Sequence, residues 1–346
     1  MADVTKITKV EKGFLADDGQ KRGPMTMARV RFHPREAKLL AQIVDRRLAL
    51  FDLDAEPVEK AKGKGKHVLG ELVCLHEIGW VRAFAFHPTG EAVVTGGSDR
   101  TLRLWPWADG RPAESPTKHA AAHEGWVEAV AYSPDGKLVV SVGADEKVKV
   151  WSAADLKLLE TLSGHERYLA DVVFTRDGRS FLTGGEDGKV IVWETASLKP
   201  LATIDYGGAN NQFGQTPRHS GVHRLAISHD DRWLGVAGGE ALNIYDLPAR
   251  ALVATEKWDM DLAFHPAWNL LAGGESEVKF WSYDAAQLAP PELDKNGKPL
   301  KPKMLPGKLV AGVKRGDWSL GIDFSLDGKR VALGKSDGTL ELYELT

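Results

Sequence analysis

The stretches Thr95–Trp105 (TGGSDRTLRLW), Ser141–Trp151 (SVGADEKVKVW) and Thr183–Trp193 (TGGEDGKVIVW) are three copies of one pattern. In each copy a Ser or Thr lies ten residues before the Trp, an Asp six before it, and a His 28 or 29 before it. Four residue types held in register over such a length are typical of a repeat architecture rather than of an isolated site. The residues that fill the pattern are His76, Thr95, Asp99, Trp105, His123, Ser141, Asp145, Trp151, His165, Thr183, Asp187 and Trp193.

An alternating apolar run followed by a turn lies between the His and the Asp of each copy, as in VRAFAFHPTG and VEAVAYSPDG. Alternation predicts a strand with one face in a core, and the Pro, Asp and Gly that follow predict a turn. The run recurs in MARVRFHPRE, VHRLAISHDD, DMDLAFHPAW and SLGIDFSLDG, so the chain contains seven units. In these four further units the later strand-like runs end on Phe51, Tyr245, Trp281 and Tyr343.

Seven units with these motifs resemble the WD-repeat family of β-propellers, whose blades are four-stranded antiparallel sheets. The resemblance implies an all-β, seven-bladed β-propeller in which the His, Ser or Thr, Asp and Trp of a blade form a hydrogen-bonded structural tetrad. A linked tetrad suits these residues because a buried indole N–H and a buried carboxylate both need partners. Only three units of this chain contain all four residues, so the other blades are expected to depend more on apolar packing.

The unit boundaries predict a single domain over residues 1–346. The last unit ends just after its third strand, whereas VTKITKV precedes the first strand of the first unit. We therefore expect residues 4–10 to supply the outer strand of the last blade, which closes the ring and removes an exposed sheet edge. The expected blades span about 26–75, 76–120, 123–162, 165–205, 220–255, 258–313, and 318–346 together with 4–10.

Composition narrows the classes of function. The net charge of −3 carries no general signature of nucleic-acid or membrane binding. Cys74 is the only cysteine, which excludes a disulfide framework and predicts a buried thiol. The N-terminus lacks the apolar segment of a signal peptide, and no stretch approaches the roughly 18 apolar residues of a membrane span. We expect a soluble, cytoplasmic protein without membrane contact, either monomeric or a subunit of a larger complex.

Motifs for catalysis, metal binding or cofactor binding are absent from the sequence. It contains no HExxH, paired-Cys or GxSxG motif. Three histidines belong to the tetrads, and His33, His87 and His265 occupy equivalent turn positions, so a metal site is not expected and no cofactor is implied. Enzymatic propellers place carboxylates around the central channel, where Asp171, Asp261 and Asp323 on first strands could converge, although such residues also satisfy backbone groups.

A set of aromatic residues is the strongest candidate for a binding surface. They lie six residues before the end of the first strand in five of the seven units, which the family geometry puts near one mouth of the channel. Aromatic and Arg side chains are enriched in binding hot spots, but residues at this position also pack against the neighbouring blade. The aromatic candidates are Trp80, Trp126, Tyr168, Trp258 and Trp318; the polar candidates beside them are Arg82, Glu128 and His223; and an insertion at 206–219 adds Phe213 and Arg218.

The function expected from these features is a non-catalytic scaffold that binds protein partners on the channel-mouth face. One alternative is a propeller enzyme or small-molecule binder that uses the central channel. Another is binding of an acidic protein or a nucleic acid by the lysine-rich loops 54–67 and 282–307. Nucleic acid is the weaker of these two partners because the loops lack Arg and interleaved aromatic residues.

Overall fold

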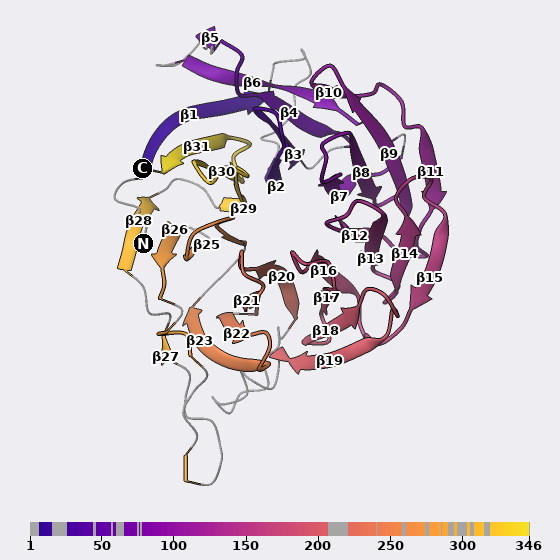
Figure 1. Cartoon of the computed structure of the whole chain (residues 1–346). Coiled ribbons are helices and arrows are strands. Elements are labelled where there is room, and N and C mark those ends of the chain that lie inside the picture. The colour runs from indigo at the N-terminus through magenta and orange to yellow at the C-terminus, as the bar shows by residue number, and fades with distance from the viewer. Residues whose placement is uncertain are drawn as a thin grey trace.

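The protein is a ring of seven blades around a central channel (Figure 1). The structure, a computed structural model, describes residues 7–15, 26–43, 46–56, 58–59, 66–74, 76, 78–206, 221–239, 241–257, 261–273, 277–284, 286–289, 294–295, 303–304, 308–314 and 319–345. Within these residues, no helix has the length and hydrophobicity that crossing a membrane requires. The predicted fold class, an all-β propeller with four-stranded antiparallel blades, is confirmed.

Each blade is described from the channel outward. Blade 1 consists of β2 (Met27–Phe32), β3 (Lys38–Ile43), β4 (Leu48–Asp52) and β6 (Lys66–Val73), and blade 2 of β7 (Val81–Phe86), β8 (Ala92–Gly97), β9 (Thr101–Ala108) and β11 (Lys118–Ala121). Blade 3 consists of β12 (Val127–Tyr132), β13 (Leu138–Gly143), β14 (Val148–Ser152) and β15 (Leu158–Leu162), and blade 4 of β16 (Leu169–Phe174), β17 (Ser180–Gly185), β18 (Lys189–Glu194) and β19 (Pro200–Asp205).

Blade 5 consists of β20 (Val222–Ile227), β21 (Trp233–Gly238), β22 (Ala241–Asp246) and β23 (Ala251–Lys257). Blade 6 consists of β24 (Leu262–Phe264), β25 (Leu270–Gly273), β26 (Glu277–Ser282) and β28 (Lys308–Lys314). Blade 7 consists of β29 (Ser319–Phe324), β30 (Arg330–Lys335), β31 (Leu340–Leu345) and β1 (Ile7–Leu15). Short strands β5 (Val58–Glu59), β10 (Arg111–Pro112) and β27 (Lys303–Met304) pair with β6, β9 and β23.

The hydrophobic core lies between neighbouring blades. Second strands such as β8 and β17 are buried at every position after the first, whereas only the last residue of the outer strand β15 is buried. The glycine pair of the TGG motif permits this close packing. A Cβ at Gly96 would lie 2.5 Å from the Val127 side chain of the next blade, and one at Gly97 would lie 2.7 Å from Nδ1 of His76. The motif therefore leaves room for both the neighbouring blade and the tetrad.

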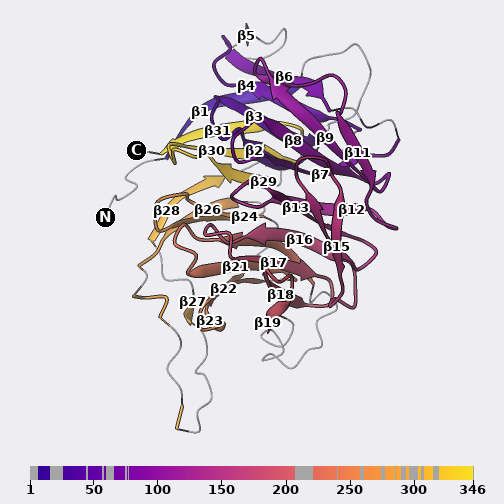
Figure 2. The same ribbon diagram turned by 45° about the vertical axis from the view of Figure 1, so that its right-hand side comes forward.

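The ring is closed by its N-terminal strand, as predicted, but the strand is longer than expected. Figures 1 and 2 show β1 beside β31, with which it pairs antiparallel from Ile7 with Leu345 to Gly13 with Leu340. The strand runs to Leu15 rather than ending at residue 10, and its last residues pair in parallel with β6 of blade 1. Blades 1 and 7 therefore share one nine-stranded sheet.

Three histidines join the turns that follow the first strands. The Nε2–H groups of His33, His87 and His265 donate to glycine carbonyls of the next blade at 2.9, 3.2 and 2.9 Å. In the last of these contacts the acceptor is Gly328, whose φ is +71°. A Cβ on Gly328 would lie 2.3 Å from Nε2 of His265, so this contact requires glycine.

Candidate functional site

The three complete tetrads are continuous hydrogen-bonded chains. The indole Nε1–H of Trp105, Trp151 and Trp193 donates to the Thr or Ser hydroxyl at 2.8, 2.9 and 2.9 Å. That hydroxyl lies 2.7, 2.8 and 2.9 Å from Nε2 of the His, whose Nδ1 lies 3.2, 2.8 and 2.9 Å from the Asp carboxylate. Since Nδ1–H must donate to the carboxylate, Nε2 accepts from the hydroxyl, and every donor and acceptor in the chain has a partner.

Electrostatics keep the tetrad carboxylates ionised. Burial is the largest single influence on the pKa of Asp145 and would raise it, but the His123 side chain and the backbone N–H groups of Glu124 and Lys147 together lower the pKa to about 2. Burial also opposes ionisation of Asp99, yet hydrogen bonds from His76 and Arg103 hold the pKa of Asp99 well below its usual range. Burial lowers the pKa of His76. Ionised aspartates paired with buried histidines brace the blade turns.

Two blades without a full tetrad contain substitutes that the sequence patterns did not indicate. In blade 5, Thr255 Oγ1 donates to Asn243 Oδ1 at 2.7 Å, and the fully buried Tyr206 donates its hydroxyl to the carbonyls of Gly238 and Ala241. Tyr206 is the first residue of the 206–219 insertion predicted from the sequence, but in the structure it belongs to the core. In blade 7, Tyr343 Oη donates to Glu341 Oε2 at 2.7 Å, and Lys335 Nζ lies 3.4 Å from Glu341.

Three aromatic candidates are half-exposed on the face where the first strands begin. Trp80, Trp126 and Tyr168 are 53%, 51% and 45% exposed, and Ile78 beside them is 74% exposed. Their backbone carbonyls accept from Ser98, Ala144 and Glu186 N–H groups at 2.9 Å, so the main chain beneath each ring is fixed. Trp258, Trp318, Phe213 and Arg218 lie outside the described residues.

The polar candidates lie between these aromatic rings because of β-bulges. In β7, β12 and β20 the pairing with the second strand skips one residue, namely Arg82, Glu128 and His223. A bulge directs the side chain of its extra residue away from the regular alternation. Arg82 donates to Glu128 at 2.7 and 3.1 Å and lies 4.6 Å from the centre of the Trp126 ring. His223 Nε2 lies 3.0 Å from Glu186.

These side chains lie at the same end of the first strands of blades 2 to 5. Burial and the neighbouring Glu186 raise the pKa of Tyr168, which ties the last aromatic ring to the His223 pair. We call this set the aromatic face; it consists of Ile78, Trp80, Arg82, Trp126, Glu128, Tyr168, Glu186 and His223.

The channel aspartates brace the blades instead of meeting at one point. Asp171, Asp261 and Asp323 each accept a hydrogen bond from a backbone N–H of the next blade, at 2.9, 2.8 and 2.9 Å. Burial raises the pKa of Asp261, and it raises the pKa of Asp323 to about 6. No group of three His, Cys, Asp or Glu side chains in the described part of the chain has an arrangement that could hold a metal ion.

One arginine crosses the channel. Arg29 extends from β2 of blade 1 to blade 4, where it lies 3.3 Å from the Asp171 carboxylate and 3.3 Å from the Ala170 carbonyl. Both charged side chains are less than a tenth exposed. Burial and the neighbouring Arg224 lower the pKa of Arg29 to about 10, so Arg29 remains charged. The sequence offered no pattern for this contact.

The lysine-rich loops 54–67 and 282–307 lie largely outside the described residues, so their role stays a prediction. The described end of the second loop includes β27, which pairs in parallel with β23 of blade 5.

Comparison with known proteins supports the fold and the repeats. Residues 72–106, 114–152 and 156–194 match the family model described as WD domain, G-beta repeat, and these stretches contain the Asp and Trp of the three complete tetrads. Among 1864 matching chains of solved structures, the crystal structure of the WD40 β-propeller domain of Doa1 is similar over 98% of this chain and 97% of that chain, with a TM-score of 0.68 and 16% identity. Such low identity supports the fold alone. No curated protein matches the sequence.

Proposed function

We propose that this WD-repeat propeller is a non-catalytic scaffold for protein–protein interaction, and that a protein partner binds its aromatic face. WD40 propellers generally act as protein-interaction scaffolds, which supports the first part of the proposal. The second part depends on one observation, the three half-exposed rings of Trp80, Trp126 and Tyr168 in three consecutive blades.

The energetic argument begins with the exposed area of these rings. A large aromatic side chain can bury about 200 Å², so covering the open half of each ring removes about 100 Å² from water. At about 25 cal/mol per Å² this contributes roughly 2.5 kcal/mol per ring. Three rings held on a fixed main chain bring that area together at low cost in conformational entropy, as binding hot spots do.

The ion pairs between the rings supply a polar component. The Arg82–Glu128 and His223–Glu186 pairs are partly exposed, and exposed pairs contribute little to folding stability. The Arg82 guanidinium and the Glu128 and Glu186 carboxylates can instead select a partner with complementary charges and determine its orientation. The Trp126 ring contacts Arg82 and is still 51% exposed, so packing within the propeller and contact with a partner are compatible at this residue.

The test is affinity purification from the native cell, with quantitative mass spectrometry of the captured proteins. We propose that the protein acts in the cytoplasm, so the soluble fraction is the starting material. The triple variant Trp80→Ala, Trp126→Ala, Tyr168→Ala should lose at least one protein that the wild type captures. The matched control changes Leu158, Leu159 and Leu201 to Ala, because these side chains are similarly exposed but lie on the outer strands β15 and β19.

Two results would contradict separate parts of the proposal. Equal capture of every partner by the triple variant would show that the aromatic face is not the binding surface. Capture of no protein by the wild type, beyond what an unrelated propeller captures, would contradict the scaffold role itself.

A further inference from the structure

A recess lies at the end of the channel opposite the aromatic face, where the first strands finish. A cavity of about 500 Å³ is lined there by residues of blades 1 to 5, and an adjoining cavity of about 210 Å³ by residues of blades 1, 4, 6 and 7. The two cavities share Phe32, Pro34 and Arg176, so we treat them as one recess and call it the turn-side cavity. Its size lies in the range of small-molecule sites, about 300–1,000 Å³.

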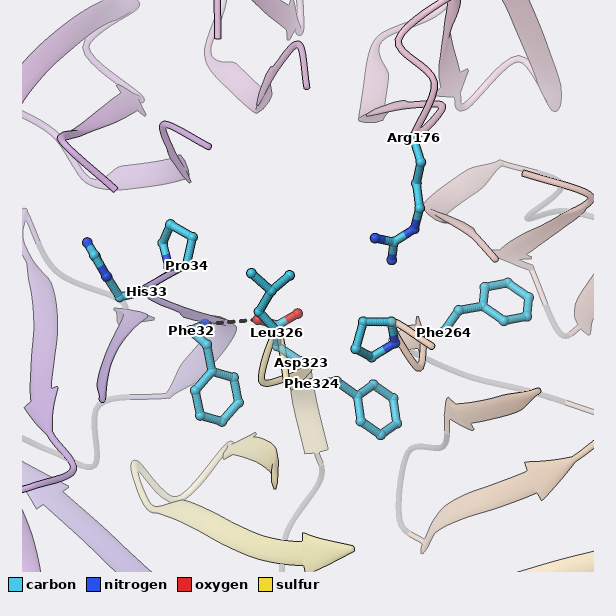
Figure 3. Close-up of a pocket in the computed structure, with 9 residues that line it drawn as sticks. Phe32, His33, Pro34, Arg176, Phe264, Asp323, Phe324 and Leu326 are labelled. Atoms are coloured by element: carbon cyan, nitrogen blue, oxygen red, sulfur yellow. Dashed lines mark hydrogen bonds between the residues drawn. The ribbon is translucent and has the colours of Figure 1, made fainter. Parts of the chain in front are cut away.

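Phenylalanine side chains form part of the wall of the turn-side cavity. Phe32, Phe86 and Phe174 end the first strands of blades 1, 2 and 4, and each is only partly buried. Phe324 and Leu326 complete the wall from blade 7, and Leu326 is 63% exposed. Figure 3 shows Phe32, Phe324 and Leu326 grouped at one side of the opening. An apolar molecule in this space would cover rings that now contact water.

The inner end of the turn-side cavity is formed by the Arg29–Asp171 pair. Both residues line the larger cavity, and their contact spans the channel from blade 1 to blade 4. A first strand of six residues is about 20 Å long, so the aromatic face and the turn-side cavity lie at opposite ends of the same strands. The two surfaces can therefore bind different molecules.

Positive charge exceeds negative charge in the lining. Arg29, Arg31 and Arg176 face two carboxylates, Asp171 and Asp323, and each carboxylate already accepts a backbone hydrogen bond. Arg29 is taken up by Asp171, which leaves Arg31 and Arg176 as the cations with capacity for a ligand.

These two guanidinium groups are available for an anion. The Arg31 side chain is 39% exposed; its Nη1 donates to the Val30 and Ile322 carbonyls at 2.8 and 3.5 Å and forms a long ion pair with Asp323 at 4.0 Å, which leaves its other N–H groups for a ligand. Arg176 is exposed, and within the described part of the chain no carboxylate forms an ion pair with its guanidinium. In Figure 3 the Arg176 side chain extends from its turn toward the centre of the recess, on the side opposite Phe32.

We propose that the turn-side cavity binds a small organic anion, with its apolar body against the phenylalanine rings and its carboxylate or phosphate between Arg31 and Arg176. The planar guanidinium matches both anions because it can form two parallel charge-assisted hydrogen bonds. The aromatic wall supplies affinity for the body of the ligand, and the two arginines determine its orientation.

The test is a fluorescence titration of the folded protein with 8-anilinonaphthalene-1-sulfonate, an apolar aromatic anion. We expect saturable binding at one site per chain. Benzoate or phenylphosphate should displace the probe, whereas uncharged benzyl alcohol should not. The better of the two competitors identifies the preferred anion. Arg176→Gln should weaken binding by roughly tenfold or more, since it removes a charge-assisted contact. Arg179→Gln is the matched control, because Arg179 follows in the same turn, is exposed and pairs with Asp177.

Three results would overturn the proposal. The first is the absence of saturable binding, and the second is equal binding of the probe by the wild type and Arg176→Gln. The third is loss of binding in the variant Trp80→Ala, Trp126→Ala, which would show that the probe binds the aromatic face. Circular dichroism of each variant checks that it is folded. Partner capture by the aromatic face does not depend on this outcome, so the two proposals can fail separately.

Discussion

Replacing Thr183 with Val tests whether the tetrads stabilise the fold through their hydrogen bonds. Thr183 is fully buried, and its hydroxyl lies 2.9 Å from Nε1 of Trp193 and 2.9 Å from Nε2 of His165. Valine has nearly the same shape as threonine, so the substitution removes the hydroxyl with little change in packing. It leaves a buried indole N–H and a buried imidazole nitrogen without their partner.

The magnitude follows from these two groups. A buried donor or acceptor that loses its partner costs about 1–3 kcal/mol. With two such groups, the free energy of unfolding should fall by about 2–6 kcal/mol. Thr183→Ser keeps the hydroxyl, as Ser141 does in blade 3, and should lose only about 1 kcal/mol for the missing methyl group.

The assay is urea unfolding at pH 7.5 followed by tryptophan fluorescence, with the slope of the transition compared among the variants. Thr195→Val is the control within the same blade. Its hydroxyl is buried and has no hydrogen-bond partner among the described residues, so its removal breaks no hydrogen bond and should not lower the free energy of unfolding. A loss for Thr183→Val no greater than that for Thr183→Ser would refute the role given to the hydrogen-bonded chain.

Three further predictions concern the channel, the turns and the closure of the ring. The pKa of Asp323 is about 6 in the folded protein, above the ordinary value of 3.8, so the stability of the wild type falls as pH rises between these two values. Asp323→Asn removes this pH dependence. In urea titrations the variant should therefore gain up to about 3 kcal/mol relative to the wild type between pH 4 and pH 7. Gly328→Ala should lower the melting temperature more than Gly178→Ala does. Both glycines have positive φ, but the new Cβ would lie 2.3 Å from Nε2 of His265 at Gly328 and 3.5 Å from the Pro134 side chain at Gly178. Equal losses in the two variants would argue against the His265 contact. Deletion of residues 1–15 removes β1 and should lower the melting temperature by more than about 5 °C. Deletion of residues 1–6, which precede β1, should change the melting temperature by less than about 2 °C. Indistinguishable melting curves for the two deletions would contradict the closing role of β1.

Local patterns made the number of blades and the tetrads accessible from the sequence. The residues of a tetrad lie within about 30 positions of one another, so their spacing can be recognised in each copy separately. Tyr206 illustrates the limit of this approach. The tetrad pattern has a His before the first strand of the same blade, whereas Tyr206 lies at the end of the preceding blade and bonds to the Ala241 carbonyl, so the pattern does not include it.

Contacts between distant residues were not accessible. Arg29 and Asp171 are 142 residues apart, and the repeat pattern pairs no residue of blade 1 with a residue of blade 4. The bulges at Arg82, Glu128 and His223 depend on the register of a neighbouring strand, which the periodicity of one strand does not contain. For the same reason the parallel pairing of β1 with β6 was missed, although the pairing of β1 with the last blade was predicted.

The pairing of β1 with β31 also orders the events of biosynthesis. Ile7 leaves the ribosome before Leu345, and at roughly 5–20 residues per second the synthesis of the residues between them takes tens of seconds. Blades 2 to 6 contain only strands that are close in sequence, apart from the short β27, and can form during that time, whereas joining the two ends has a high contact order and comes last. Until then the edge of β31 is open to other chains, so slowing this final step should favour domain-swapped dimers in which β1 of one molecule completes blade 7 of another.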